Sequence, residues 1–274
     1  MTQTNNRRWT ALLTLGMYAI ALTASAANFS GSDDFSTATG SWGPDVTTGS
    51  GSFVVANGAL NFLTPSFSPN EQATRFWTES YGSYTADWSL RMDVFLGTFP
   101  MSSGQFASAG MYVQNQSDAS QDFVRVILRR DGESSRNFYA DAYANGTFLG
   151  SLWIPTLSTT VSLGLGYDAT THTIIAAYDP DGAANGYLFT PFTGTAIDAL
   201  GSDWHMTPSD VFGVRVLAQT TLPIENGQLS IDNFFAGPTP LAVVPEPSSV
   251  YLGALAFGVF LIWRRVRKTP NHAP

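Results

Sequence analysis

Apolar and polar residues alternate along much of the chain between residues 29 and 236. In Trp88–Val94 every second residue is a large apolar one, and the residues between them are polar or charged. Apolar residues also alternate with Arg125 and Arg129 at Val124, Val126 and Leu128, and with Gly213 and Arg215 at Phe212, Val214 and Val216. A period of two with one polar face predicts antiparallel strands that bury a single side. Only Thr195–Leu200 has the spacing of a short helical turn.

Asn-Gly dipeptides mark turns between these predicted strands, because both residues accept the positive φ that a tight hairpin requires. They predict a hairpin of residues 53–55 with 60–63 and another of 138–143 with 148–153. Asp131-Gly132 predicts a turn from 123–129 to 138–143, and Asp168–Thr171 joins 161–167 to 173–178. So many short strands predict an all-β chain folded as an antiparallel two-sheet sandwich, or jelly roll.

Two parts of this region resemble a known family. The opening of concanavalin A-like lectin/glucanase domains is resembled by three stretches near the start of this region: Ser32–Phe35, Trp42 and Asn57–Leu60. Leu229–Phe234 resembles the last strand of those domains. The resemblance implies the jelly-roll architecture, with a last strand that returns beside the first.

The N-terminus has the pattern of an export signal. Arg7-Arg8 precedes an apolar stretch over residues 9–22, and Ala24 and Ala26 form an A-x-A cleavage site. A basic region, an apolar region and small residues in this order predict a signal peptide over residues 1–26, with an N-terminal signal helix.

The C-terminus carries three parts in fixed order. Pro245, Glu246 and Pro247 come first, the apolar run 250–263 follows, and a basic cluster ends the segment with Arg264, Arg265, Arg267 and Lys268. The run's 14 residues would span roughly 21 Å as a helix, less than the ~30 Å of a hydrocarbon core. We therefore expect a transmembrane helix over residues 249–263 that crosses a locally thinned bilayer or crosses it only temporarily. The positive-inside rule places its basic cluster in the cytoplasm.

This tail resembles the PEP-CTERM sorting signal of Gram-negative bacteria. The resemblance rests on Pro245, Glu246, Pro247 and the basic residues Arg264, Arg265 and Arg267. It implies recognition by an exosortase, passage through the inner membrane, and delivery to the cell surface or an exopolysaccharide matrix. An ordinary C-terminal membrane anchor is the alternative interpretation.

These segments divide the chain into a signal peptide (1–26), an ectodomain (27–236), a linker (237–243), a sorting signal (244–268) and a tail (269–274). The ectodomain has seven arginines, no lysine and 20 acidic residues, a net charge of −13. Such a body repels nucleic acid. The chain has no cysteine, which excludes disulfides, thiolate metal sites and cysteine nucleophiles.

The sequence lacks the common catalytic motifs. The E-x-D-x-x-E pattern of the glucanases that it resembles does not occur, nor do H-E-x-x-H or G-x-S-x-G. Asp179-Pro180-Asp181-Gly182 has the right spacing for two carboxylates, but its composition is that of a turn. We therefore expect no catalytic residues, although two carboxylates from distant strands remain an alternative.

Two sets of residues are candidates for binding. The resemblance to lectin-like jelly rolls, in which a structural calcium often ties the first strand to the last, implies Asp34 and Asp232 as Ca²⁺ ligands. Arg125 and Arg129 share one strand face, and Tyr139 and Tyr143 share a face of the next strand. Such a patch suits an anionic or neutral glycan, or represents cross-strand pairing alone.

Large aromatic residues are further candidates for stacking on sugar rings, although most aromatics of a sandwich pack its core. They are Trp42, Trp77, Tyr81, Tyr84, Trp153 and Trp204.

Together these observations predict an exported surface or extracellular-matrix protein. Its ectodomain would bind or scaffold an extracellular polysaccharide without catalysis, after a membrane-anchored intermediate. Two alternatives stay open: a glycoside hydrolase or lyase acting on that polysaccharide, and a structural matrix protein without a ligand. The expected partners are an exosortase, the inner membrane and a polysaccharide, and not nucleic acid.

Overall fold

The computed structural model of this chain describes residues 28–37, 40–65, 70–118, 122–133, 135–193 and 204–244. The predicted signal peptide, the sorting signal from residue 245 on and the helical turn at 195–200 lie outside these ranges. Within them, no helix has the length and apolar character needed to cross a bilayer.

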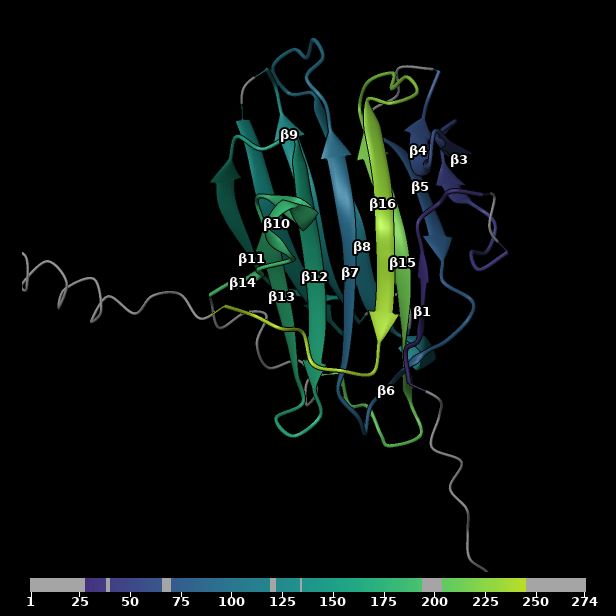
Figure 1. The fold of residues 1–274 in the computed structure, drawn as a ribbon, viewed down its shortest axis with the longest axis vertical. Helices are drawn as coiled ribbons and strands as arrows, with labels where there is room; N and C mark the ends of the chain where they lie inside the picture. Colours follow the sequence, from purple (N-terminus) through teal and green to yellow (C-terminus); the bar gives the residue numbers. More distant parts are fainter. Residues whose placement is uncertain are drawn as a thin grey trace, which may run out of the picture.

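The described residues form two antiparallel eight-stranded sheets packed face to face (Figure 1). In order across the first sheet, the strands are β14 (Thr190–Pro191), β13 (Thr173–Asp179), β12 (Thr160–Asp168), β7 (Trp88–Leu96), β16 (Leu229–Gly237), β4 (Ala59–Leu63) and β3 (Ser52–Ala56), with β1 (Gly31–Asp33) also on β16. The prediction of an all-β, two-sheet sandwich is confirmed.

The second sheet lies behind the first in Figure 1. Its strands are, in order, β11 (Thr147–Thr156), β10 (Ser135–Ala144), β9 (Phe123–Asp131), β8 (Phe106–Asn115), β15 (Val211–Thr220), β5 (Glu71–Phe76) and β2 (Val46–Thr48), with β6 (Gly82–Ser83) also on β15. Two short 3₁₀ helices, η1 (Gln116–Asp118) and η2 (Gly182–Asn185), complete the described elements.

The predicted hairpins form with the expected turn chemistry. Asn57 and Gly58 have φ of 56° and 72°, and Asn145 and Gly146 have φ of 50° and 72°. Positive φ at both positions matches the right-handed twist of the strands that each turn joins, β3–β4 and β10–β11. The last strand also returns beside the first, with Asp33 opposite Phe234.

The core lies between the sheets and consists of the inward half of each alternating strand. Trp88, Leu90, Met92 and Val94 of β7 are fully buried, as the alternation predicts. The outward positions of the same strand are therefore left for surface chemistry, and the same holds for β9 and β10 in the second sheet.

The chain after β16 crosses the outer face of the first sheet toward β14 (Figure 1). Leu241 lies directly over Gly164 and Gly166 of β12, where an added Cβ at Gly166 would come within 2.7 Å of the Leu241 Cβ. The amide of Val244 donates a hydrogen bond to the carbonyl of Phe189 (2.8 Å). The predicted linker 237–243 thus contacts the sheet through Leu241, although residues 238–240 and Ala242 are exposed.

Candidate functional site

The outer face of the second sheet carries a continuous group of aromatic and arginine side chains over β8 to β11. We call it the aromatic–arginine face. All four residues that the sequence analysis singled out as a possible glycan patch lie on it, because each occupies an outward position of β9 or β10. Its members are Phe106, Phe123, Arg125, Arg129, Tyr139, Asp141, Tyr143, Phe148 and Trp153.

Asp141 joins two of these residues. It lies directly opposite Arg125 in the pairing of β9 and β10. Arg125 donates from Nε (3.0 Å) and Nη2 (2.5 Å) to the two carboxylate oxygens, and the Tyr139 hydroxyl donates to Oδ2 (2.8 Å). The Asp141 side chain is only 1% exposed. The sequence analysis missed this residue, although its position midway between Tyr139 and Tyr143 places it on the same face.

The network changes the acidity of its members. Burial alone would lower the pKa of Arg125, but the hydrogen bonds and charge of Asp141 raise it above the usual value. Burial raises the pKa of Tyr139 to about 12, and the negative charge of Asp141 adds to this effect. At neutral pH the site therefore holds a charged arginine beside a neutral phenol.

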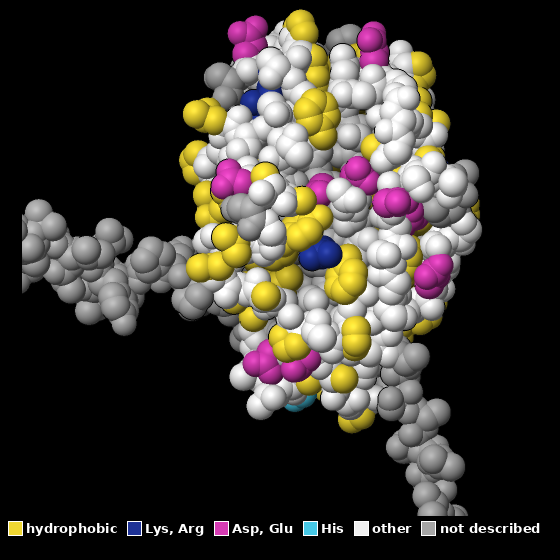
Figure 2. Space-filling view, viewed as in Figure 1, with side chains coloured by type: hydrophobic (Ala, Val, Ile, Leu, Met, Phe, Trp, Pro, Cys, Tyr) yellow, Lys and Arg dark blue, Asp and Glu magenta, His cyan; other side chains and the backbone are white. Residues whose placement is uncertain are grey.

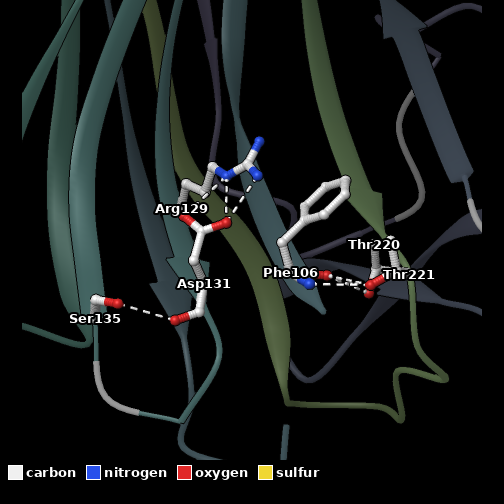
Figure 3. A network of polar contacts seen from close by, with 6 residues as sticks. All are labelled: Phe106, Arg129, Asp131, Ser135, Thr220 and Thr221. Atoms are coloured by element: carbon white, nitrogen blue, oxygen red, sulfur yellow. Dashed lines mark hydrogen bonds and ion pairs between the residues drawn. The ribbon is translucent and has the colours of Figure 1, made fainter. Parts of the chain in front are cut away.

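Arg129 forms the second ion pair of the face, with Asp131 two residues away (2.7 Å, Figure 3). Its guanidinium carbon lies 4.3 Å from the ring centroid of Phe106 and 5.6 Å from that of Trp153. Figure 3 shows Arg129 turned toward Asp131, with the Phe106 ring on the neighbouring strand. Each arginine of the patch thus has its own carboxylate, and the face carries little net charge.

The aromatic rings follow one another along the same strands. Tyr139 and Trp153 are 4.3 Å apart between ring centroids, Phe123 and Tyr143 are 4.6 Å apart, and Tyr143 and Phe148 are 5.4 Å apart. Trp153 and Phe148 are 47% and 51% exposed. Exposed aromatic groups of this size mark binding surfaces more often than isolated apolar residues do.

A β-bulge places Phe148 on this face. Trp153 follows Phe148 by an odd number of positions, so a regular strand would turn the two side chains to opposite sides. The register between β10 and β11 shifts at Ala142 and Tyr143, which brings Phe148 opposite Tyr143. The bulge re-aims the side chain, a common role of such irregularities.

The other aromatic candidates divide between core and surface. Trp42, Trp77 and Trp204 are buried, Tyr84 packs against the core, and Tyr81 is 39% exposed. Only Trp153 among the predicted tryptophans lies exposed in the described part of the chain beside other members of the patch.

The predicted calcium ligands lie near each other on the first sheet. Asp34 follows β1 and accepts a hydrogen bond from the Ser36 amide (3.0 Å), and Asp232 on β16 accepts one from the Asn233 amide (2.7 Å). Within the described residues, no group of three or more His, Cys, Asp or Glu side chains is arranged to hold a metal ion. Ca²⁺ takes six to eight oxygen ligands, and this pair supplies few of them, so the two carboxylates fit the ion poorly.

Asp93 and Asp232 are the closest arrangement to a catalytic carboxylate pair that we find in the described residues, because they face each other across β7 and β16. Burial raises the pKa of Asp232, and the charges of Asp93, Asp34 and Asp33 raise it further. Asp93 is buried and accepts hydrogen bonds from the Ser162 hydroxyl and from Asn233 Nδ2 (2.8 Å). These hydrogen bonds explain the buried Asp93 carboxylate as a structural hydrogen-bond acceptor.

The sequence interpretation of Asp179 as a turn residue agrees with its contacts. Asp179 is fully buried and accepts hydrogen bonds from the amides of Asp181 (3.0 Å) and Leu188 (2.8 Å). Burial raises its pKa. Its oxygens are used to close the turn that follows β13.

No protein-family model matches the chain, and no curated protein matches it significantly. Solved structures do. The CBM2 module of an evolved Dit protein of Lactobacillus casei BL23 phage J-1 superposes with a TM-score of 0.50 at 14% identity, over 79% of this chain and 99% of that one. The Emp46p carbohydrate recognition domain in its potassium-bound form gives 0.48 at 13% identity, over 76% and 96%.

The winged bean acidic lectin complexed with methyl-α-D-galactose gives a TM-score of 0.48 at 11% identity, over 76% of this chain and 96% of the lectin. At 14% identity the likeness to the CBM2 module shows a shared fold alone and does not identify a ligand.

Proposed function

We propose that this chain is an exported surface or extracellular-matrix protein whose ectodomain binds a neutral polysaccharide through the aromatic–arginine face, without catalysis. The observation that carries the proposal is the exposed Trp153, which lies next to Tyr139 and Arg129 on an open sheet face. A sugar ring offers apolar C–H groups to an aromatic ring, and its hydroxyl groups need hydrogen-bond partners at the rim.

The charge balance of the face supports a neutral ligand. Arg125 and Arg129 are each paired with a carboxylate, Asp141 and Asp131. An ion pair satisfies the charge of its arginine but leaves polar groups of the pair available to hydroxyls. On this face an anionic polymer would meet the carboxylates of Asp141 and Asp131 beside each guanidinium group.

The fixed geometry of the face also supports binding. Tyr139 and Arg125 are held by the buried Asp141, and both lie on regular strands rather than on loops. Side chains that are already ordered lose little conformational freedom when a ligand arrives, so less of the contact energy is lost.

Export and sorting belong to the same proposal. The signal peptide pattern ending at Ala26 and the Pro245–Pro247 motif with its basic cluster support secretion from a Gram-negative bacterium. The proposed route is a membrane-anchored intermediate, processing by an exosortase, and release to the cell surface or matrix. Mass spectrometry of the mature protein tests it: a C-terminus near residue 245 supports sorting, and an intact residue 274 contradicts it.

A glycan array with the purified protein tests binding. We expect binding to at least one neutral polysaccharide, and Trp153→Ala should weaken it about tenfold, since a stacked aromatic contact contributes about 1 kcal/mol or more. Leu157→Ala is the matched control, because Leu157 is an apolar residue that is 90% exposed just beyond β11 and is not a member of the face. Absence of any glycan binding, or equal binding by Trp153→Ala, contradicts the proposal.

Structural calcium at Asp34 and Asp232 remains a separate prediction. Thermal melts with added calcium and with chelator test it, and identical midpoints contradict it. The few oxygen ligands that these residues offer argue for at most a weak site.

A further inference from the structure

The outer face of the first sheet carries a hollow of about 420 Å³, on the side of the molecule opposite to the aromatic–arginine face. Figure 2 shows this side, with a basic patch near its centre, hydrophobic side chains around that patch and acidic side chains gathered next to it. The lining includes Ser32, Asp34, Arg91, Tyr187, Asn233 and Phe235.

Arg91 is held between two aromatic rings in this hollow. Its guanidinium carbon lies 4.0 Å from the ring centroid of Tyr187 and 4.7 Å from that of Phe235. A cation–π contact uses a face of the planar group, so the N–H edges of the guanidinium remain for hydrogen bonding.

Those edges have no partner among the described residues. Arg91 forms no ion pair and no hydrogen bond there, and its Nε is buried without an acceptor. In this respect Arg91 differs from Arg125 and Arg129, each of which has its own carboxylate. The terminal N–H groups of Arg91 are not buried, so they are accessible to a ligand oxygen.

The surroundings keep the guanidinium in place. Phe235 follows the irregular register of β16 between Asp232 and Phe235, which turns its ring beside Arg91 of β7. Tyr187 comes from the loop after η2, at a φ of 62°, and its hydroxyl lies 3.5 Å from Asp93. A planar cation fixed in this way is suited to a planar carboxylate, which it can meet with two parallel hydrogen bonds.

The remaining polar groups of the hollow suit hydroxyl groups. Asp34 is exposed and accepts a hydrogen bond from the Ser36 amide, while Ser32 and Asn233 add a hydroxyl and an amide. The carboxylate of Asp34 repels a second negative charge. A ligand with one carboxylate and several hydroxyls therefore fits better than sulfate or phosphate.

We propose that this hollow binds one uronic acid residue of an acidic polysaccharide, with its carboxylate on Arg91 and its hydroxyls on Ser32 and Asp34. This site is independent of the aromatic–arginine face and goes beyond the neutral glycan proposed for that face. A protein with both sites would connect a neutral and an acidic polymer from opposite sides of the sandwich.

Calorimetry with the purified protein tests the proposal. The probes are glucuronate and galacturonate oligosaccharides, the matching neutral oligosaccharides, and sodium sulfate at equal ionic strength. We expect a uronate oligosaccharide to bind and Arg91→Gln to weaken that binding at least about tenfold. Arg91→Lys keeps the charge but not the planar fork, and should also bind more weakly than the wild type.

Arg215→Gln is the matched control. Arg215 lies on β15 of the other sheet, its Nε is likewise buried without a partner, and it lies over a single ring, Phe76, at 5.4 Å. It should bind uronate as the wild type does. Trp153→Ala should also keep uronate binding while losing neutral glycan, which separates a failure of this proposal from a failure of the proposed function.

Three results would overturn the inference. The first is that no uronate oligosaccharide binds, and the second is that Arg91→Gln and Arg91→Lys both bind the uronate like the wild type. The third is that a neutral oligosaccharide or sulfate displaces the bound uronate at equal concentration. Thermal melts of the folded variants accompany each measurement, and Arg91→Lys keeps the test decisive if Arg91→Gln does not fold.

Discussion

Removing the Asp141 carboxylate should destabilise the protein far more than removing the carboxylate of the neighbouring ion pair. In Asp141→Ala, Arg125 would keep its charge in a site where its side chain is only 22% exposed, and would lose both of its hydrogen bonds to the carboxylate. Breaking a buried ion pair by removing one partner costs about 3–5 kcal/mol. For a body of this size that lowers the melting temperature by roughly 10 °C.

Asp131→Ala removes an acceptor of the same kind from Arg129, but the Asp131 side chain is 37% exposed and Arg129 is 27% exposed. An exposed pair contributes about 0–1 kcal/mol, because water takes over the lost contacts. The double variant Arg125→Met with Asp141→Leu removes both charges together, and should recover most of the loss of the single variant.

Urea denaturation followed by tryptophan fluorescence measures these differences as changes in the free energy of unfolding. The reasoning requires Asp141→Ala to lose at least about 2 kcal/mol more than Asp131→Ala. Equal losses for the two variants, or a double variant no more stable than Asp141→Ala, would refute the buried, charge-paired account of this face.

Three further predictions concern single residues. The pKa of Tyr139 in the folded protein is raised to about 12 from its ordinary value of 10. The stability that Tyr139 contributes is therefore complete below pH 10 and is lost as the pH rises toward 12. In thermal melts across that pH range, Tyr139→Phe should lose less stability than the wild type. Gly110→Ala places a Cβ 2.1 Å from the Val126 carbonyl oxygen and should lower the free energy of unfolding by about 2 kcal/mol or more in urea. Asp232→Asn removes the cost of burying that charge and its repulsion with Asp93, and should raise the melting temperature at pH 7 without calcium; an unchanged or lower value would count against both effects.

Local patterns were sufficient to predict the sheets and their hairpins. The alternation in Trp88–Val94 needs only the two-residue repeat of a strand, and Asn57-Gly58 carries its own turn geometry. The patch of Arg125 and Tyr139 was also predictable, because strand neighbours on one face follow from the same repeat. What the pattern did not show was that Asp141 neutralises Arg125.

The hollow at Arg91 lay beyond such reasoning. Tyr187 belongs to a loop about 100 residues away in the sequence, and Phe235 reaches Arg91 only through an irregular register. Leu241 likewise covers Gly164 only because the chain turns back across β12 after its last strand. Such contacts between distant segments are set by tertiary packing, and no periodic pattern in the sequence reveals them.

The most direct test of the central claim is to map the bound glycan on the protein by NMR chemical-shift changes, using the best neutral ligand from the array. The account predicts that the changes centre on β9, β10 and β11, with the indole N–H of Trp153 among the largest. Changes centred elsewhere, with the Trp153 indole unmoved at saturating ligand, would contradict it.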